Sequence, residues 1–199
     1  MNATETPGAL ASDLAAVARR LRQSTVELRA MEHAIGSGII WGADGLIVTC
    51  AHVLRGRGRA SGAPAVRLAD GRLLRAVVLA CDRRVDLAVV RVDEQDLPAA
   101  SIGDSDRLRA GELVLAVGHP FGLIGAVVTG VVHAASGGEA RTDSPWIRAD
   151  LRLAPGHSGG PMADARGCVV GVNTMIAGGL ALAVPSRVAG ALVERCLTR

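Results

Sequence analysis

The chain has 199 residues, of which 49% are hydrophobic, 21% charged and 2% aromatic, and its formal net charge is +3. This composition is too apolar and too weakly charged for a disordered chain, and no apolar run reaches the roughly 20 residues that span a bilayer. The length corresponds to one domain or to two small lobes that share a core. Two tryptophans, one phenylalanine and no tyrosine leave little for the aromatic platforms on which many proteins stack nucleic-acid bases. Nucleic acid is therefore not an expected partner.

Helical periodicity is found at the two ends of the chain. Apolar residues recur at spacings of three and four over residues 9–22, which predicts an amphipathic helix. A second helix is predicted after Pro185, with its apolar positions again on one face. The apolar positions of the two helices are Leu10, Leu14, Val17 and Leu21, and Val188, Leu192 and Cys196.

Between these helices the pattern changes to short runs rich in Val, Ile and Leu, separated by Gly, Asp and Pro. Asp70-Gly71 lies between two of the runs and is a strong hairpin signal. About ten short strands without interleaved helices predict an antiparallel barrel or sandwich. The expected strands are 38–41, 46–49, 65–68, 73–79, 87–92, 113–117, 127–133, 146–148, 169–172 and 180–184.

The four cysteines are Cys50, Cys81, Cys168 and Cys196, and no two of them form a CxxC pair. The spacing therefore supports neither a zinc site nor a redox motif, and we expect no metal and no cofactor. Two disulfides remain an alternative in an oxidising compartment. The first residues lack a basic segment followed by an apolar one. We therefore expect a cytoplasmic protein with reduced thiols, or a periplasmic or other extracytoplasmic one if an export segment precedes this sequence.

The clearest chemical motif is GHSGGP at residues 156–161. A serine hydroxyl becomes a good nucleophile only when a base removes its proton. The glycines allow a tight turn whose N–H groups can face a developing oxyanion. We expect Ser158 to be the nucleophile, with the amides of Gly156 and Ser158 as the oxyanion hole; a glycine-rich hairpin loop is the alternative interpretation.

Two further residues complete a possible triad. His52 follows the strand expected at 46–49, where a general base would be held rigidly. Asp86 directly precedes the strand expected at 87–92 and could orient the imidazole, with Asp82 as a competing candidate. The chain order His52, Asp86, Ser158 matches that of chymotrypsin-like enzymes. The separations of 34 and 72 residues fit two six-stranded barrels that meet at a cleft.

The chain resembles the HtrA/Deg family of trypsin-like serine proteases over about residues 34–190. The resemblance implies two perpendicular six-stranded antiparallel β-barrels, peptide-bond hydrolysis and the triad named above. The expected units are residues 1–33 as a helix with a lead-in strand, 34–105 as the first barrel, 106–185 as the second barrel and 186–199 as the closing helix. The matching stretches are 36–41, 45–54, 86–90, 102–105, 111–122, 156–161, 171–174 and 182–186.

Several positions depart from the family pattern. His157 and His119 stand where the family usually has asparagine, and we expect a tolerated substitution and a turn residue, with a pH-sensitive element as the alternative for His157. The sequence ends one helix after the second barrel, so we expect no PDZ domain. The resemblance makes a trimer possible, whereas the lack of N-terminal aromatics argues against one.

We expect the activity to be that of a serine endopeptidase acting on protein or peptide substrates, mainly unfolded ones, in protein quality control or regulated proteolysis. The alternative is a catalytically silent peptide-binding or regulatory module on a protease scaffold. An apolar pocket would prefer a small or medium aliphatic residue before the cut, unless Arg152 points inward and selects an acidic one. The expected pocket residues are Leu153, Met175, Ile176, Leu180 and Ala181.

Overall fold

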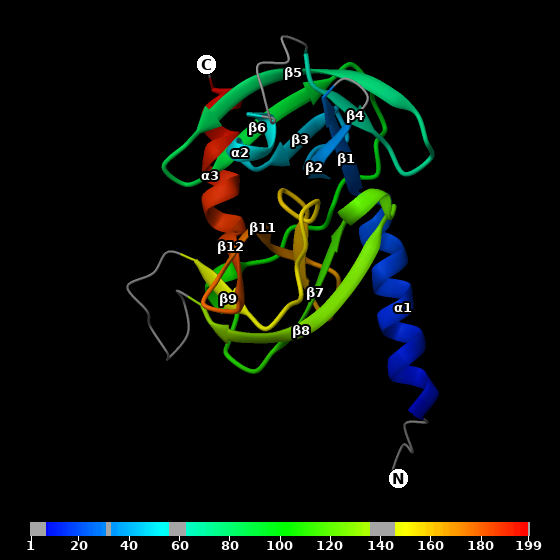
Figure 1. Ribbon diagram of the computed structural model, residues 1–199, viewed down its shortest axis with the longest axis vertical. Helices are drawn as coiled ribbons and strands as arrows, with labels where there is room; N and C mark the ends of the chain where they lie inside the picture. Colours follow the sequence, from blue (N-terminus) through cyan, green and yellow to red (C-terminus); the bar gives the residue numbers. More distant parts are fainter. Residues whose placement is uncertain (1–6, 31–32, 56–62, 136–145, 199) are drawn as a thin grey trace.

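The computed structural model describes residues 7–30, 33–55, 63–135 and 146–198 (Figure 1). In this part of the chain, strands form two closed antiparallel barrels of six strands each. The predicted all-β class with a helix at each end is confirmed. The first barrel contains β1 (Thr25–Ala30), β2 (His33–Ile40), β3 (Leu46–Thr49), β4 (Ala65–Arg67), β5 (Leu73–Asp82) and β6 (Leu87–Val92). The second contains β7 (Leu113–Gly118), β8 (Ala126–Ala134), β9 (Ile147–Ala149), β10 (Pro161–Asp164), β11 (Val169–Ala177) and β12 (Leu180–Pro185).

The two barrels have the same strand order. The first closes as β1-β2-β3-β6-β5-β4, and the second, taken from β7, as β7-β8-β9-β12-β11-β10. In both, the third strand is therefore hydrogen-bonded to the sixth, as β3 is to β6 and β9 is to β12. This repeat places the end of β3 beside the start of β6, with Thr49 opposite Ala88.

Both barrels are filled with aliphatic side chains, as the low aromatic content requires. One buried cluster runs from the first barrel into the second, and another lies within the second barrel. The largest fully buried side chains include Leu28, Ile39, Ile47, Leu115 and Met162. Close packing of this kind fixes the barrels against each other and so fixes the segments that lie between them.

Three α-helices are described. Helix α1 (Pro7–Gln23) contacts β1 and β7, and much of its length extends away from the barrels (Figure 1). Helix α3 (Ser186–Leu197) contacts β5 and β6 of the first barrel as well as β11 and β12 of the second. The short helix α2 (Ala51–Leu54) directly follows β3. No described helix is long and apolar enough to cross a membrane.

Two strands were not among the ten expected runs, β1 and β10. β1 is the lead-in strand expected within residues 1–33. Its Val26 and Leu28 lie in the core, and Glu27, on the opposite face, is also buried and is held by Arg29 at 2.9 Å and Arg67 at 3.5 Å. β10 begins at Pro161, directly after a glycine-rich turn, and glycine and proline are typical of turns and not of strands. β1 pairs with both β2 and β4 and is a full member of the first barrel. The division into 34–105 and 106–185 stays a prediction.

Candidate active site

His52 and Asp86 lie together because α2 begins where β6 begins. The N–H of Ala51 donates to the Asp86 carbonyl at 3.2 Å, and the N–H of His52 donates to Oδ1 of Asp86 at 3.0 Å. The Nδ1 atom of His52 lies 2.7 Å from Oδ2 of the same carboxylate. Asp86 adopts a left-handed backbone conformation with φ of 56°. Aspartate tolerates this conformation better than most residues, and here it turns the carboxylate toward the helix.

The charge state of this pair follows from its surroundings. Partial burial of Asp86 opposes ionisation, but hydrogen bonds from His52 and Thr174 outweigh it and hold the pKa of Asp86 below its usual value. An ionised carboxylate can only accept hydrogen bonds, so the proton of a neutral His52 is on Nδ1. Its Nε2 atom then keeps a lone pair, as a general base requires. The competing residue, Asp82, instead lies 3.6 Å from Arg195.

Ser158 lies in the loop between β9 and β10, on the second barrel. Its hydroxyl donates to the carbonyl of Thr174 at 2.9 Å, and the Thr174 hydroxyl donates to Oδ2 of Asp86. Thr174 therefore links the expected nucleophile to the expected orienting carboxylate. Within the described residues, the Ser158 hydroxyl makes no hydrogen bond to His52. The sequence did not single out Thr174, although it ends a stretch that resembles the HtrA/Deg family.

In the loop around Ser158, two amide N–H groups have no acceptor among the described residues. The carbonyl of His157 accepts from the N–H of Gly160 at 3.0 Å. Since the two ends of a trans peptide point in opposite directions, the N–H of Ser158 points away from this turn. Neither that group nor the N–H of Gly156 has a partner among the described residues. Amides without a protein acceptor are available as oxyanion-hole donors.

Two histidines are buried against this loop, and neither was expected to be internal. His157 packs beside Gly118. Its Nδ1 atom lies 3.1 Å from the backbone nitrogen of Ala154 and 3.2 Å from the carbonyl oxygen of the same residue. Burial lowers the pKa of His157. His119 accepts a hydrogen bond from the N–H of Gly125 at 3.2 Å, and burial lowers its pKa too. The Nε2 atoms of both rings are buried without a partner in the described part of the chain.

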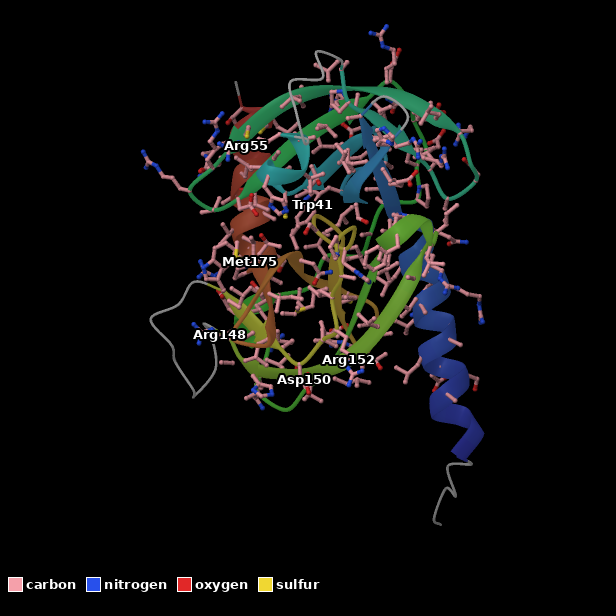
Figure 2. The ribbon with its side chains drawn as sticks, viewed as in Figure 1. Trp41, Arg55, Arg148, Asp150, Arg152 and Met175 are labelled. Atoms are coloured by element: carbon pink, nitrogen blue, oxygen red, sulfur yellow. The ribbon has the colours of Figure 1, made fainter. Side chains whose placement is uncertain are left out.

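The expected pocket residues are not all accessible. Met175 and Ile176 are 46% and 52% exposed, Leu153 and Leu180 are partly buried, and Ala181 has no exposed surface. Arg152 is exposed beside Asp150 on the β8 side of the second barrel, and both line a surface hollow there (Figure 2). Met175 lies higher in the same view, closer to the first barrel. The pocket residues stay a prediction.

One group of described residues could hold a metal ion. The donor atoms of Cys50, His52 and Asp86 all lie within 4.8 Å of one another. The Nδ1 atom of His52 is already hydrogen-bonded to the Asp86 carboxylate at 2.7 Å. Burial, followed by the charge of Asp86, strongly raises the pKa of the Cys50 thiol, so the thiolate that a metal needs is disfavoured. The group therefore fits a hydrogen-bonded acid–base pair better than a metal centre. All four cysteines are free.

Comparison with known proteins shows the family and supports the fold. A family model described as "Trypsin-like peptidase domain" matches residues 36–172. A solved structure of the "HtrA-type protease AlgW with decapeptide" superposes with a TM-score of 0.82 at 27% identity, covering 94% of this chain and 68% of that one.

Curated relatives are more similar in sequence. A "Probable periplasmic serine endoprotease DegP-like" of Pseudomonas savastanoi pv. phaseolicola is 41% identical over 163 residues, which is 78% of this chain and 33% of the relative. A protein of the same name from Marinomonas sp. is 39% identical over 169 residues, 81% of this chain and 35% of the relative. The chain thus spans about a third of the length of these relatives.

These relatives overturn the expected cytoplasmic location. The names of these relatives place them in the periplasm. The cytoplasmic expectation depended only on the residue pattern at the start of the sequence. The fold and the resemblance to HtrA/Deg proteases are confirmed. The chain belongs to the family of trypsin-like peptidase domains and is homologous to HtrA- and DegP-type proteases.

Proposed function

We propose that the chain is a serine endopeptidase with His52, Asp86 and Ser158 as its triad and the amides of Gly156 and Ser158 as its oxyanion hole. The observation that carries this proposal is the doubly bonded carboxylate: Asp86 accepts from both the backbone N–H and the ring of His52. This contact fixes the ring and its tautomer before substrate arrives. Fixing the ring in advance is the role of the aspartate in a serine protease triad.

The proposed reaction begins with a turn of the Ser158 hydroxyl from the Thr174 carbonyl toward Nε2 of His52. His52 takes the hydroxyl proton while the oxygen attacks the carbonyl carbon of the scissile peptide. The negative charge that develops on the carbonyl oxygen is held by the N–H groups of Gly156 and Ser158. His52 then gives its proton to the leaving amine. A water molecule, deprotonated by His52, attacks the acyl carbon, and His52 returns that proton to the Ser158 oxygen as the acyl group leaves as a carboxylic acid.

Several finer assignments rest on the relatives. We infer that the substrates are unfolded proteins or peptides, because the relatives are endoproteases and a related structure was solved with a decapeptide. We place the protein in the periplasm or another extracytoplasmic space, with a role in protein quality control or regulated proteolysis. A trimer stays a prediction from the resemblance. The exposed apolar side chains of Met175 and Ile176 support an aliphatic preference before the cut.

The test uses a fluorophosphonate probe and labelled casein. The wild-type chain should be labelled at one serine and should cleave casein, and Ser158→Ala should abolish both. Ser101→Ala is the matched control, since Ser101 is exposed and its side chain makes no contact with the triad in the described structure. A wild-type chain that binds casein without cleaving it, and that the probe does not label, would favour the silent binding module instead.

A further inference from the structure

Ser37 of β2 connects the first barrel to the nucleophile loop. Its hydroxyl donates to the carbonyl of Gly156 at 2.7 Å and accepts from the N–H of His119 at 3.1 Å. Its own backbone N–H donates to the carbonyl of Ser158 at 2.8 Å. Ser37 has no exposed surface. One residue of the first barrel thus holds the carbonyls of two residues whose N–H groups form the candidate oxyanion hole.

The hydroxyl of Ser37 fixes one peptide plane in particular. The carbonyl of Gly156 and the N–H of His157 belong to the same peptide. The carbonyl accepts from Ser37 at 2.7 Å and more weakly from the N–H of His119 at 3.2 Å, and the N–H of His157 donates to the carbonyl of Ala154 at 3.0 Å. With both ends held, this peptide cannot rotate independently of the loop. The orientation of the preceding N–H, that of Gly156, then depends on the φ and ψ angles of Gly156.

The φ angle of Gly156 lies in a region that the residue alone does not fix. Gly156 has φ of 108°, in the left-handed region, and a Cβ placed there would lie 2.5 Å from the carbonyl oxygen of His119. Glycine is conformationally permissive, so nothing in the residue itself prevents another φ. The hydroxyl of Ser37 hydrogen-bonds to two groups that border Gly156, its own carbonyl and the N–H of His119.

We propose that Ser37 is a positioning residue for the reaction, whose hydroxyl sets the orientation of the Gly156 N–H in the oxyanion hole. This inference rests on the proposed serine endopeptidase function. It assigns to Ser37 no contact with substrate. It also explains why a buried hydroxyl of the first barrel faces a loop 119 residues away in the chain.

Removing the hydroxyl should leave the fold intact. In Ser37→Ala, the carbonyl of Gly156 keeps its hydrogen bond from the N–H of His119 at 3.2 Å, so neither partner is left unsatisfied. The matched control is Ser186→Ala, which also removes a buried hydroxyl that donates to a glycine carbonyl at 2.7 Å, here that of Gly103. Ser37→Cys keeps the shape of the side chain with a weaker donor and serves if the alanine variant folds poorly.

The first measurement is steady-state hydrolysis of a fluorogenic peptide with valine before the cut, together with inhibition by a peptide boronic acid. Ser37→Ala should lower kcat about 10- to 100-fold and leave KM within about twofold, since the hole acts on the transition state. Affinity for the boronic acid, which places a negative oxygen in the hole, should fall by a similar factor. Ser37→Cys should show an intermediate loss. Equal losses in Ser37→Ala and Ser186→Ala, or a rise in KM with unchanged kcat, would overturn the proposal.

The second measurement does not depend on turnover. Amide NMR spectra of wild type, Ser37→Ala and Ser186→Ala should show changed Gly156 and Ser158 resonances only in the Ser37 variant. Unchanged Gly156 and Ser158 resonances would refute the positioning role, even for an enzyme whose kcat had fallen. A wild-type chain without turnover would instead contradict the endopeptidase assignment, and these spectra would still decide whether Ser37 holds the loop.

Discussion

Thr174 of β11 donates its hydroxyl to the carboxylate of Asp86, which precedes β6, so a hydrogen bond joins the two barrels behind the candidate base. The two residues are 88 positions apart in the chain. The same carboxylate oxygen faces Nδ1 of His52. The orientation of the imidazole therefore depends on both barrels, and each of these groups can be removed separately.

Asp86→Asn should lower kcat by about four orders of magnitude, because an amide would favour the wrong tautomer of His52. The measurement is kcat on a fluorogenic peptide with the folded fraction checked by circular dichroism. Asp82→Asn is the control, since Asp82 pairs with Arg195 and not with His52. If Asp82→Asn lost as much activity as Asp86→Asn, the assignment of Asp86 would be wrong.

Thr174→Val should have a smaller effect, a loss of about tenfold in kcat. The variant removes one of the hydrogen bonds that favour the ionised form of Asp86, while those from His52 remain. The Thr174 carbonyl, which accepts from Ser158, is retained because it belongs to the backbone. A Thr174→Val enzyme with wild-type kcat would show that the contacts from His52 alone hold the carboxylate.

The residues that the sequence identified and those that it missed differ in kind. His52 and Asp86 were recognisable as candidates because each adjoins an apolar run, and Ser158 because it lies in the GHSGGP motif. Thr174 and Ser37 carry ordinary hydroxyls, and their partners lie across the junction between the barrels. The sequence contains both residues within stretches that resemble the family, but only the packing of the barrels shows which atoms their hydroxyls reach. The burial of His157 was likewise not visible, because its surroundings come from β7 and from its own loop.

The buried histidines should make the folded state sensitive to acid. Burial lowers the pKa of His157 and of His119 in the folded state, whereas an unfolded histidine titrates near about 6.5. Below that value the unfolded chain binds more protons, so stability is full above about pH 6.5 and is lost as the pH falls toward the lowered folded pKa values. Glu27 opposes this effect at His119, whereas Arg67 and the other histidine add to it.

His157→Asn should therefore flatten the pH dependence of stability. Urea unfolding between pH 7.5 and 5 should show a loss of up to about 1.4 kcal/mol per pH unit for each buried histidine in the wild type. In His157→Asn, the loss of unfolding free energy per pH unit should be smaller by the contribution of one histidine. His133→Asn is the control, because His133 is exposed. If both variants kept the wild-type slope, His157 would not be the residue whose protonation opposes folding.

The cysteines should differ in reactivity. Burial, reinforced by the charge of Asp86, raises the pKa of the Cys50 thiol far above its usual value, whereas Cys81 is exposed. Because the thiolate is the reactive form, iodoacetamide at pH 8 should modify Cys81 and leave Cys50 untouched in the folded protein. Peptide mass spectrometry after brief labelling measures modification at both cysteines, and Cys81→Ala removes the site that should react rapidly. Rapid modification of Cys50 in the native protein would contradict the burial found beside the triad.

The last prediction separates two costs of replacing a glycine in the nucleophile loop. Gly159 has φ of 85°, and a Cβ there would lie 2.1 Å from the Ser37 carbonyl oxygen and 2.3 Å from the Thr49 hydroxyl. Gly71, in the hairpin after β4, has φ of 91°, but a Cβ there would meet nothing within 4 Å. Gly71→Ala should therefore cost only the left-handed conformation, about 1–2 kcal/mol of unfolding free energy.

Gly159→Ala should cost more than Gly71→Ala, because backbone atoms of β2 would have to move as well, and it should also abolish labelling of Ser158 by a fluorophosphonate. Urea unfolding of both variants measures the difference, and labelling at a concentration of urea where both remain folded measures the site. Equal stability losses would mean that the loop moves freely away from β2. That result would conflict with the hydrogen bonds from Ser37 to Gly156 and Ser158, which tie the loop to the first barrel.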